Sequence, residues 1–379
     1  MEARNIDHRF RGRGLMQNIV VFGTYDQKNH PRVDVLIESL GLLDINIIKC
    51  NVPLDFNTQS RIQLVRQPWR LIGFCLKLLK TWFHLVLEAR KIGRSTPDVV
   101  VVGYMGVLDI HLAKMLFRAP VVLDHLAPLN GIAIDRSLPF RSIFKALDQF
   151  AEHRSSCILI DTDENLANVF DKSKAVVVPV GVSTRWLKNA TKNRTSDGPL
   201  RVCYFGAFTP LHGVAVIADA IFQLKDSDIR WTLIGRGQEF DTIFERLNHQ
   251  SNVTWIDWLE ESQLIEIVAQ HDICLGVFGQ SAKAMSVTPT KVFQGAAAGC
   301  AILTSDTPPQ RAMLGAGAVF VPPHDADELV AALRALIRDR ALVNKLGEEA
   351  TCFAQQNFSP RALSGRLQSA IELAILRAP

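Results

Sequence analysis

The residues best placed to do chemistry in this sequence lie in the segment Thr288–Gly299, TPTKVFQGAAAG, which is followed by the apolar run AILTSD. Pro289 precedes a predicted helix of small residues, and Lys291 falls in its first turn. The unpaired N–H groups and the dipole of a helix N-terminus attract an anion, and a lysine adds a full positive charge. The segment predicts a diphosphate site. The alternative is an ordinary α/β crossover whose lysine is only solvated.

Composition points to a globular protein of two domains. The chain has 379 residues, and a hydrophobic content of 48% is enough for two cores. The net charge of +4 is too small and too dispersed to favour a nucleic-acid partner. The seven cysteines include no C-x-x-C pair. This usage predicts reduced thiols, a cytoplasmic location and no zinc site.

Short β-branched runs alternate with helical stretches from Asn18 onward, which is typical of parallel α/β domains. The first sixteen residues carry four arginines without an apolar core, so they predict a disordered basic leader and not a secretory signal. The polar stretch KNATKNRTSDGP interrupts the alternation and predicts a linker. The predicted parts are the leader 1–16, an N-terminal Rossmann-like domain 17–187, the linker 188–199, a C-terminal domain 200–358, and a C-terminal helix 359–379 that packs back toward the first domain.

Twelve strands are predicted, six in each domain. Those of the first domain are Ile19–Phe22, Ile45–Lys49, Val99–Gly103, Val121–Asp124, Cys157–Asp161 and Ala175–Pro179. Those of the second are Val202–Phe205, Trp231–Ile234, Val253–Ile256, Ile273–Val277, Ala301–Thr304 and Val319–Pro322.

Glycines follow three strands of the second domain, in the runs FGAFTPLHG, LIGRGQ and LGVFGQ. Glycine lets the backbone approach a ligand closely, and the carboxyl edge of a parallel sheet is where ligands bind. The run LIGRGQ lacks the third glycine and the suitably placed acid of the dinucleotide fingerprint. A nicotinamide site is therefore not expected.

The order FG…PLHG, LIGRGQ, DICLGVFG and TPTKVFQGAAAG resembles the donor domain of GT-B glycosyltransferases of the retaining family 4 type, glycosyl transferases group 1. The resemblance implies an α/β GT-B fold of two doubly wound Rossmann-like domains that face each other across a cleft. It implies transfer of a sugar, of hexosyl type, from a nucleotide-diphosphate sugar to a saccharide or lipid-linked saccharide in polysaccharide or envelope glycan synthesis. The donor-binding residues that it implies are Gly206, His212, Gly213, Gly235, Gly237, Thr290, Lys291 and Gln294.

The chain departs from the usual pattern of that family and resembles a variant branch. Ala207 stands where the family usually has arginine, and His212 where it has lysine. Val287 and Gln294 stand where it has two glutamates seven residues apart. Lys291 and His212 remain as phosphate partners, and the Gln294 carbonyl can accept a hydrogen bond from a ribose hydroxyl. The alternatives are a loop histidine without a ligand and two solvated helix residues.

In the first domain the candidate catalytic residues are Asp124 and His125, which end a predicted strand. A histidine there can donate to a sugar hydroxyl or neutralise developing charge, and the resemblance implies a histidine or its equivalent at about this place. The alternative is a capping aspartate beside a surface histidine. The second candidate is the loop after the first strand, expected to face the diphosphate as an acceptor or phosphate loop: Gly23, Thr24, Tyr25 and Asp26.

No metal is expected, and the nucleotide-sugar serves as co-substrate without a further cofactor. The triplet Asp161–Asp163 spells D-x-D, but so do residues 226–228 and 325–327, so chance explains it. The retaining outcome implied by the family needs no protein nucleophile. The diphosphate itself helps to deprotonate the acceptor, and Lys291 stabilises the departing phosphate.

The stretch Pro68–Lys91 predicts a helix that is largely apolar with one basic stripe, formed by Arg70, Lys77, Lys80, His84 and Lys91. Between Arg61 and Arg94 eight Lys and Arg residues accompany one acid. A basic stripe beside an apolar face suits an anionic membrane, which predicts peripheral contact with the inner face of the cell membrane through residues 68–91. The alternative is a helix packed on its own sheet with a solvated basic edge.

Two rival functions stay open at this point. One is a sugar-nucleotide epimerase of the same architecture, which needs no separate acceptor surface, so the helix at 68–91 argues against it. The other is a non-catalytic glycan-binding protein with a degenerate donor site. Unchanged function in cells after Lys291→Ala would favour this second rival.

Overall fold

The computed structural model describes residues 17–27, 30–54, 70–104, 106–126, 128–135, 141–189 and 198–378. The predicted leader 1–16 and residues 190–197 of the predicted linker lie outside these residues. Contacts divide the chain into two compact units. The first comprises the residues up to Ile160, Val169–Val176 and the residues from Ser364 onward, and the second comprises Asp161–Asn168 and Val177–Leu363.

Residues 177–187, expected in the first domain, cluster with the second unit. Helix α8 (Thr184–Lys188) contacts α12 (Thr290–Ala297). The Trp186 side chain is buried, and its indole nitrogen donates to a carboxylate oxygen of Glu261 at 3.1 Å. These contacts tie the stretch to the second unit although its sequence continues the pattern of the first.

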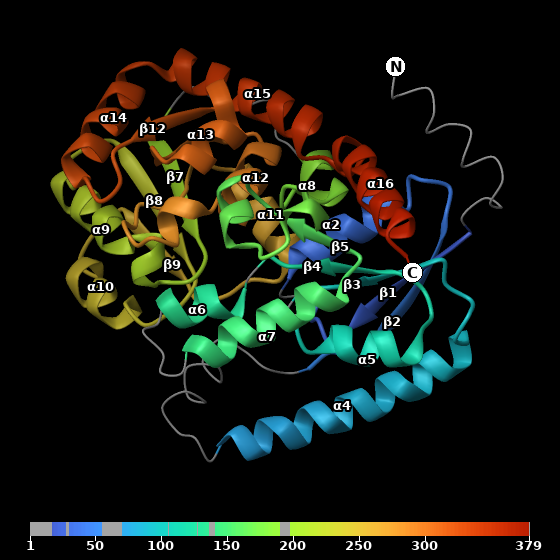
Figure 1. Cartoon of the computed structure of the whole chain (residues 1–379). Coiled ribbons are helices and arrows are strands. Elements are labelled where there is room, and N and C mark those ends of the chain that lie inside the picture. The colour runs from blue at the N-terminus through green and yellow to red at the C-terminus, as the bar shows by residue number, and fades with distance from the viewer. Residues whose placement is uncertain are drawn as a thin grey trace. The chain divides into compact units, whose positions relative to one another are not determined.

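The first unit is built on a six-stranded sheet in the order β2-β1-β3-β4-β5-β6, in which the pairs from β2 to β5 are parallel. Helices cover both faces of this sheet (Figure 1). The strands are β1 (Asn18–Gly23), β2 (Asn46–Asn51), β3 (Val99–Val102), β4 (Val121–Asp124), β5 (Cys157–Ile160) and β6 (Ala175–Val177). The helices are α2 (Pro31–Leu40), α4 (Arg70–Ile92), α5 (Asp109–Leu116), α6 (Leu129–Asp135), α7 (Arg141–Arg154) and α16 (Pro360–Leu376), with a 3₁₀ turn, η2 (Lys172–Lys174).

The second unit is built on a six-stranded parallel sheet in the order β12-β11-β10-β7-β8-β9. Its strands are β7 (Leu200–Phe205), β8 (Ile229–Ile234), β9 (Val253–Ile256), β10 (Ile273–Leu275), β11 (Ala301–Ser305) and β12 (Ala318–Val321). Its remaining helices are α9 (Val214–Gln223), α10 (Phe240–Leu247), α11 (Glu261–Ala269), α13 (Pro308–Leu314), α14 (Ala326–Arg338) and α15 (Arg340–Asn357). Four 3₁₀ turns complete it: η1 (Glu164–Asn168), η3 (Pro210–His212), η4 (Ala284–Ser286) and η5 (Gly315–Gly317).

All twelve predicted strands are present, and two Rossmann-like α/β domains are confirmed. Strand alternation sets the two faces of each sheet. In the second unit Val202 and Tyr204 of β7 join the core formed with α9, α10 and α14. Cys274 and Ile302 point to the other face, where a Cβ placed on Gly295 of α12 would meet both side chains.

The strand order reverses between β1 and β3 in the first unit and between β7 and β10 in the second. In open parallel sheets, ligands bind at the carboxyl edge where the order reverses, because the connecting loops there diverge to opposite faces. A ligand-binding site is therefore expected at the loops after β1, β7 and β10.

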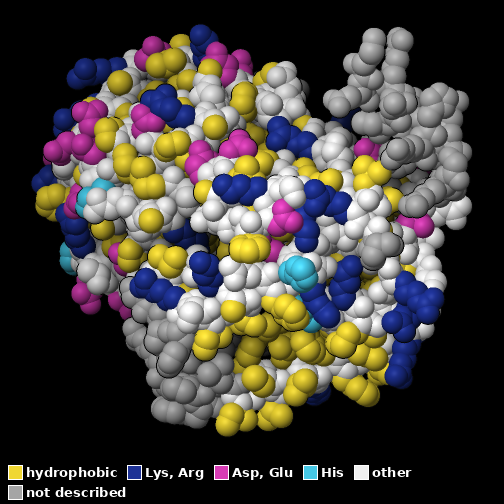
Figure 2. Space-filling model, in the orientation of Figure 1, with side chains coloured by type: hydrophobic (Ala, Val, Ile, Leu, Met, Phe, Trp, Pro, Cys, Tyr) yellow, Lys and Arg dark blue, Asp and Glu magenta, His cyan; other side chains and the backbone are white. Residues whose placement is uncertain are grey.

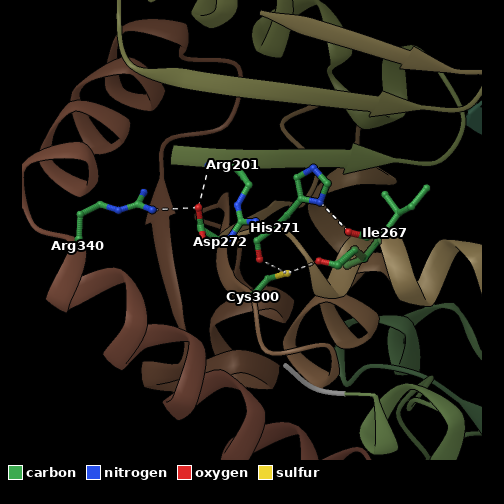
Figure 3. A network of polar contacts seen from close by, with 7 residues as sticks. Arg201, Ile267, His271, Asp272, Cys300 and Arg340 are labelled. Atoms are coloured by element: carbon green, nitrogen blue, oxygen red, sulfur yellow. Dashed lines mark hydrogen bonds and ion pairs between the residues drawn. The ribbon is translucent and has the colours of Figure 1, made fainter. Parts of the chain in front are cut away.

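The amino edge of the second sheet is held by one buried carboxylate, that of Asp272 (Figure 3). It accepts hydrogen bonds from the Arg201 backbone N–H at 2.8 Å and from Arg340 Nη2 at 3.1 Å. The neighbouring His271 ring bonds the Ile267 carbonyl through Nδ1 at 2.7 Å. The network joins β7 and β10 to α15 at the edge opposite the glycine loops, which indicates a structural role.

We predict that Asp272→Ala lowers the free energy of unfolding by about 3 kcal/mol, because it removes the shared partner of a buried charge network. Urea unfolding followed by circular dichroism measures the change. The matched control is Asp219→Ala, which removes a half-exposed pair with Arg246 and should cost less than about 1 kcal/mol. Equal effects of the two substitutions would contradict the assignment.

Candidate functional site

Lys291 presents a buried cation in the first turn of α12. Pro289 precedes the helix, and Lys291 is its second residue. The side chain is only 5% exposed, and its Nζ has no hydrogen-bond partner among the described residues. The Nζ lies 3.8 Å from the centroid of the Tyr204 ring, a cation–π contact. Burial lowers the pKa of Lys291 to about 7. The alternative of a solvated lysine is therefore wrong.

Gly206 follows β7 directly and lies beside this ammonium group. Its φ of +132° is a conformation that residues with a side chain rarely adopt. A Cβ at this position would lie 3.1 Å from the Nζ of Lys291. The absence of a side chain at Gly206 therefore leaves room for the ammonium group, and a larger residue would crowd it.

His212 lies next to the same group, but as a neutral ring. Its Nδ1 contacts the Ala207 carbonyl oxygen and lies 3.1 Å from the Tyr204 hydroxyl, which itself donates to Ala207 at 2.8 Å. Because the carbonyl only accepts, Nδ1 carries the proton and Nε2 keeps a lone pair. Burial, with the Lys291 charge second, lowers the pKa of His212 to about 3. The Nε2 atom of His212 can thus accept a hydrogen bond. A nearby anion would raise the pKa of the ring and allow Nε2 to become protonated.

The other predicted glycines pack loop against loop. A Cβ on Gly235 would lie 2.1 Å from the Gly206 carbonyl oxygen, and one on Gly237 would lie 2.4 Å from the Phe208 carbonyl oxygen. Gly213 has a left-handed φ of +63°, and its Cβ would come within 2.5 Å of backbone atoms after β10. Side chains at these positions are excluded by the chain's own backbone. The glycines therefore fix the shape of the site rather than simply admitting a ligand.

Two polar groups here were not among the predicted donor-binding residues. Glu239, two residues after Gly237, has a buried Oε2 without a hydrogen-bond partner, and burial raises the pKa of this carboxyl. Thr288, only 3% exposed, has an equally unpartnered hydroxyl. Of the remaining predicted residues, Thr290 begins α12 and Gln294 is buried one turn after Lys291. Its position just after a glycine loop could have marked Glu239 as a candidate. The dinucleotide fingerprint considers only an acid about 20 residues further along the chain.

In the first unit Asp124 and His125 follow one another but point to opposite faces of the sheet, as strand alternation requires. Asp124 is buried and accepts from Arg32 Nε of α2 at 2.7 Å. Burial nevertheless raises the pKa of Asp124. The His125 ring turns toward α7, where Nε2 lies 3.7 Å from a carboxylate oxygen of Asp148. Asp124 and His125 therefore do not form a hydrogen-bonded pair with each other.

His125 is buried and neutral. It is 4% exposed, which rules out the alternative of a surface histidine, and neither ring nitrogen has a hydrogen-bond partner among the described residues. Burial lowers the pKa of His125 to about 4. Asp148 is occupied in accepting from the backbone N–H groups of Leu129 and Asn130 at the start of α6. The imidazole thus keeps one donor and one acceptor for a further partner.

The loop Gly23–Asp26 is held at the carboxyl end of β1 by the chain itself. Asp109 Oδ2, at the start of α5, accepts from the Thr24 backbone N–H at 2.7 Å and from its hydroxyl at 2.8 Å. Asn51 Nδ2 donates to the carbonyl oxygens of Gly23 and Tyr25 at 2.8 and 2.9 Å. The Thr24 side chain is therefore engaged, and the loop reaches any ligand as a preformed structure.

Asp109 is a further residue that the sequence analysis did not identify. It is 1% exposed, and its other oxygen accepts from Trp82 Nε1 of α4 at 2.8 Å. Burial raises the pKa of Asp109 despite these bonds. No local motif marks this residue, because its partners lie 27 and 85 positions away in the sequence.

The described residues contain no group of three His, Cys, Asp or Glu side chains that could hold a metal ion. Of the three D-x-D triplets, Asp325 serves as the N-cap of α14 and accepts from the Glu328 backbone N–H. Asp161 Oδ1 accepts from Asn165 Nδ2 at 2.7 Å. These two triplets have structural partners.

A family model matches most of the second unit. Residues 199–339 match the model of the family described as glycosyl transferases group 1. The matched stretch contains Gly206, His212 and Lys291. A search of curated proteins found no match.

Solved structures share the fold over nearly the whole chain. Sucrose-phosphate synthase (tll1590) from Thermosynechococcus elongatus has a TM-score of 0.70 at 13% identity, covering 93% of this chain and 98% of that one. Anabaena Alr3699/HepE in complex with UDP-glucose has a TM-score of 0.65 at 11% identity, covering 94% and 100%. A glycosyltransferase from Rickettsia africae has a TM-score of 0.60 at 13% identity, covering 94% and 98%. At these identities the likeness shows the GT-B fold.

We predict that Lys291→Met stabilises the protein without ligand. The lysine pKa is about 7 in the folded chain and about 10.4 when unfolded, so the unfolded state binds more protons between these values. Below pH 7 the folded state must bury the charged lysine, so the loss in free energy of unfolding is largest there. This loss becomes smaller as the pH rises toward 10. The methionine variant should gain about 1–3 kcal/mol at pH 6.5 and less at pH 9, measured by urea unfolding.

The matched control is Lys345→Met, which removes a 70% exposed lysine side chain and should change stability little at either pH. A methionine variant less stable than the wild type at pH 6.5 would mean that an internal partner already stabilises the ammonium.

Proposed function

We propose that the protein is a retaining glycosyltransferase of family 4 type that transfers a sugar from a nucleotide-diphosphate sugar to a saccharide acceptor. The observation that carries the proposal is the buried Lys291 ammonium group, which lacks an anionic partner and lies where the strand order of a glycosyl transferases group 1 domain reverses. A protein retains such a costly group when a ligand offsets the cost.

A diphosphate matches the chemistry of this site. The N–H groups and dipole at the start of α12 favour negative charge, and Lys291 adds a cation in a low-dielectric setting. The developing charge on the leaving phosphate is larger in the transition state than in the bound donor, so the same groups favour bond breaking over simple binding. Thr288 and Glu239 supply unpartnered oxygens for hydroxyl groups of the donor.

In the proposed step the anomeric carbon loses its bond to the diphosphate oxygen and gains one to the acceptor oxygen on the same face. The acceptor proton passes to the departing diphosphate, so the products are the glycosylated acceptor and the nucleoside diphosphate. No covalent sugar–protein intermediate and no metal ion take part. Lys291 stabilises the departing charge, and the preformed loop Gly23–Asp26 is proposed as the phosphate-facing part of the first unit.

His125 is proposed to contact the transferred sugar. A neutral imidazole with both nitrogens unbonded can donate to one hydroxyl and accept from another. Asp124 is assigned a positioning role, because its ion pair with Arg32 fixes the strand end that carries His125. We assign the acceptor to the saccharide class, lipid-linked or free, in polysaccharide or envelope glycan synthesis.

The experiment that tests the proposal is a calorimetric screen of the full chain against UDP-, GDP-, ADP- and TDP-sugars. One donor should bind, and Lys291→Met should weaken its binding at least about 100-fold, since it removes a buried charge–phosphate contact. Lys345→Met is the control and should bind like the wild type. Failure of every donor to bind would overturn the transferase proposal. Binding without hydrolysis or transfer of any sugar would favour the glycan-binding rival.

We predict that donor affinity falls as the pH rises above 7. The diphosphate raises the Lys291 pKa from about 7, so binding takes up a proton between the free and the bound pKa. The dissociation constant should increase by up to about tenfold per pH unit between pH 7.5 and 8.5. Titrations of the identified donor at several pH values measure this slope. Lys291→Met should bind the donor weakly, with a dissociation constant that does not change with pH in this range. If this variant showed the same pH dependence as the wild type, the proton would be bound by another group.

A further inference from the structure

Helix α4 carries two separate rows of apolar side chains. One row packs into the core of the first unit through Leu78, Leu85 and Ala89. The other row points outward, with exposures between 38% and 67%, and consists of Ile72, Leu76, Leu79, Phe83 and Leu87. Positions spaced by three and four residues lie on one side of a helix, so the outward row forms a continuous strip about 22 Å long. Burial in the protein's own core therefore accounts for only one of the two apolar rows of α4.

Basic side chains run along one margin of this strip. Lys77, Lys80, His84 and Lys91 are all exposed and follow one another at helical spacing. Among these, Lys91 is paired with Glu88, the one acid of the helix. Figure 2 shows hydrophobic side chains gathered over α4 along the lower margin of the view, with Lys and Arg side chains beside them. The surface is thus apolar in the middle and positive along its side.

We propose that this strip of α4 docks on an anionic lipid surface, with the helix lying in the plane of the membrane. The five apolar side chains of the strip enter the acyl boundary, and the lysines reach the lipid phosphates while their aliphatic stems stay on the apolar surface. Among the described residues no helix is long and apolar enough to cross a bilayer. The proposal extends the predicted basic stripe by naming the apolar row that enters the lipid.

Charge complementarity selects lipid over a protein partner. An anionic leaflet attracts every basic residue near it by about 1 kcal/mol, and it accepts a straight helix without a matching groove. An exposed apolar row of this size is a liability in water unless something covers it. A second copy of the chain would bring its own lysines against these, which like-charge repulsion disfavours.

The experiment is flotation of the full chain with vesicles of phosphatidylcholine alone and of phosphatidylcholine with about 30% phosphatidylglycerol. The wild type should bind the anionic vesicles and not the neutral ones. Leu79→Glu/Phe83→Glu should lower the binding at least about tenfold. Lys77→Gln/Lys80→Gln should lower it about fivefold per lysine and flatten its dependence on salt.

The matched control is Leu42→Glu/Phe170→Glu, which adds the same charge at apolar residues of the first unit that are 57% and 73% exposed. It should bind vesicles like the wild type. The proposal is overturned if the wild type ignores anionic vesicles, if it binds neutral ones equally, or if Leu79→Glu/Phe83→Glu has no effect. A wild-type dimer that this double variant dissociates, without vesicle binding, would assign the strip to self-association. Because no donor is present, these outcomes are independent of nucleotide binding.

Discussion

The burial of the Lys291 ammonium without an anionic partner is the constraint around which the carboxyl edge of the second unit is arranged. The Tyr204 ring supplies only a weak, non-ionic partner. Burial lowers the pKa of His212, and the positive charge of Lys291 adds to this effect, so the ring beside the ammonium is neutral. Gly206 must lack a side chain because the lysine occupies the space beside it. A bound anion would offset the cost of burying the ammonium group.

The amino and carboxyl edges of the second sheet differ in how their buried polar groups are paired. At the amino edge, the Asp272 carboxylate pairs with Arg201 and Arg340 and accepts from a backbone donor, which ties β7 and β10 to α15. At the carboxyl edge, polar atoms of Lys291, Thr288 and Glu239 are buried without partners. A buried carboxylate with opposite charges beside it is typical of a structural network, whereas a buried cation without an anionic partner is typical of a ligand site. The contrast within one sheet supports the location of the donor site.

Much of this could be predicted from the sequence because the signals are local. Short β-branched runs gave the strands, and a proline followed by Thr290 and Lys291 marked a helix start with a cation. What could not be predicted depends on contacts between distant residues. Asp109 meets Thr24 across 85 positions, and the fate of Asp124 depends on Arg32. Periodicity also cannot tell which apolar row of α4 is buried, because both rows have helical spacing.

The loops after β7, β8 and β10 pack backbone against backbone, with Gly213, Gly235 and Gly237 at the points of contact. A larger residue at any of them would displace two loops at once, so these positions can diverge only together. Other side chains of the site can change without displacing the main chain. Ala207 and Gln294, where this chain differs from the common pattern, are two such positions. The ligand preference of such a site could therefore change while the packing of these three loops stays the same.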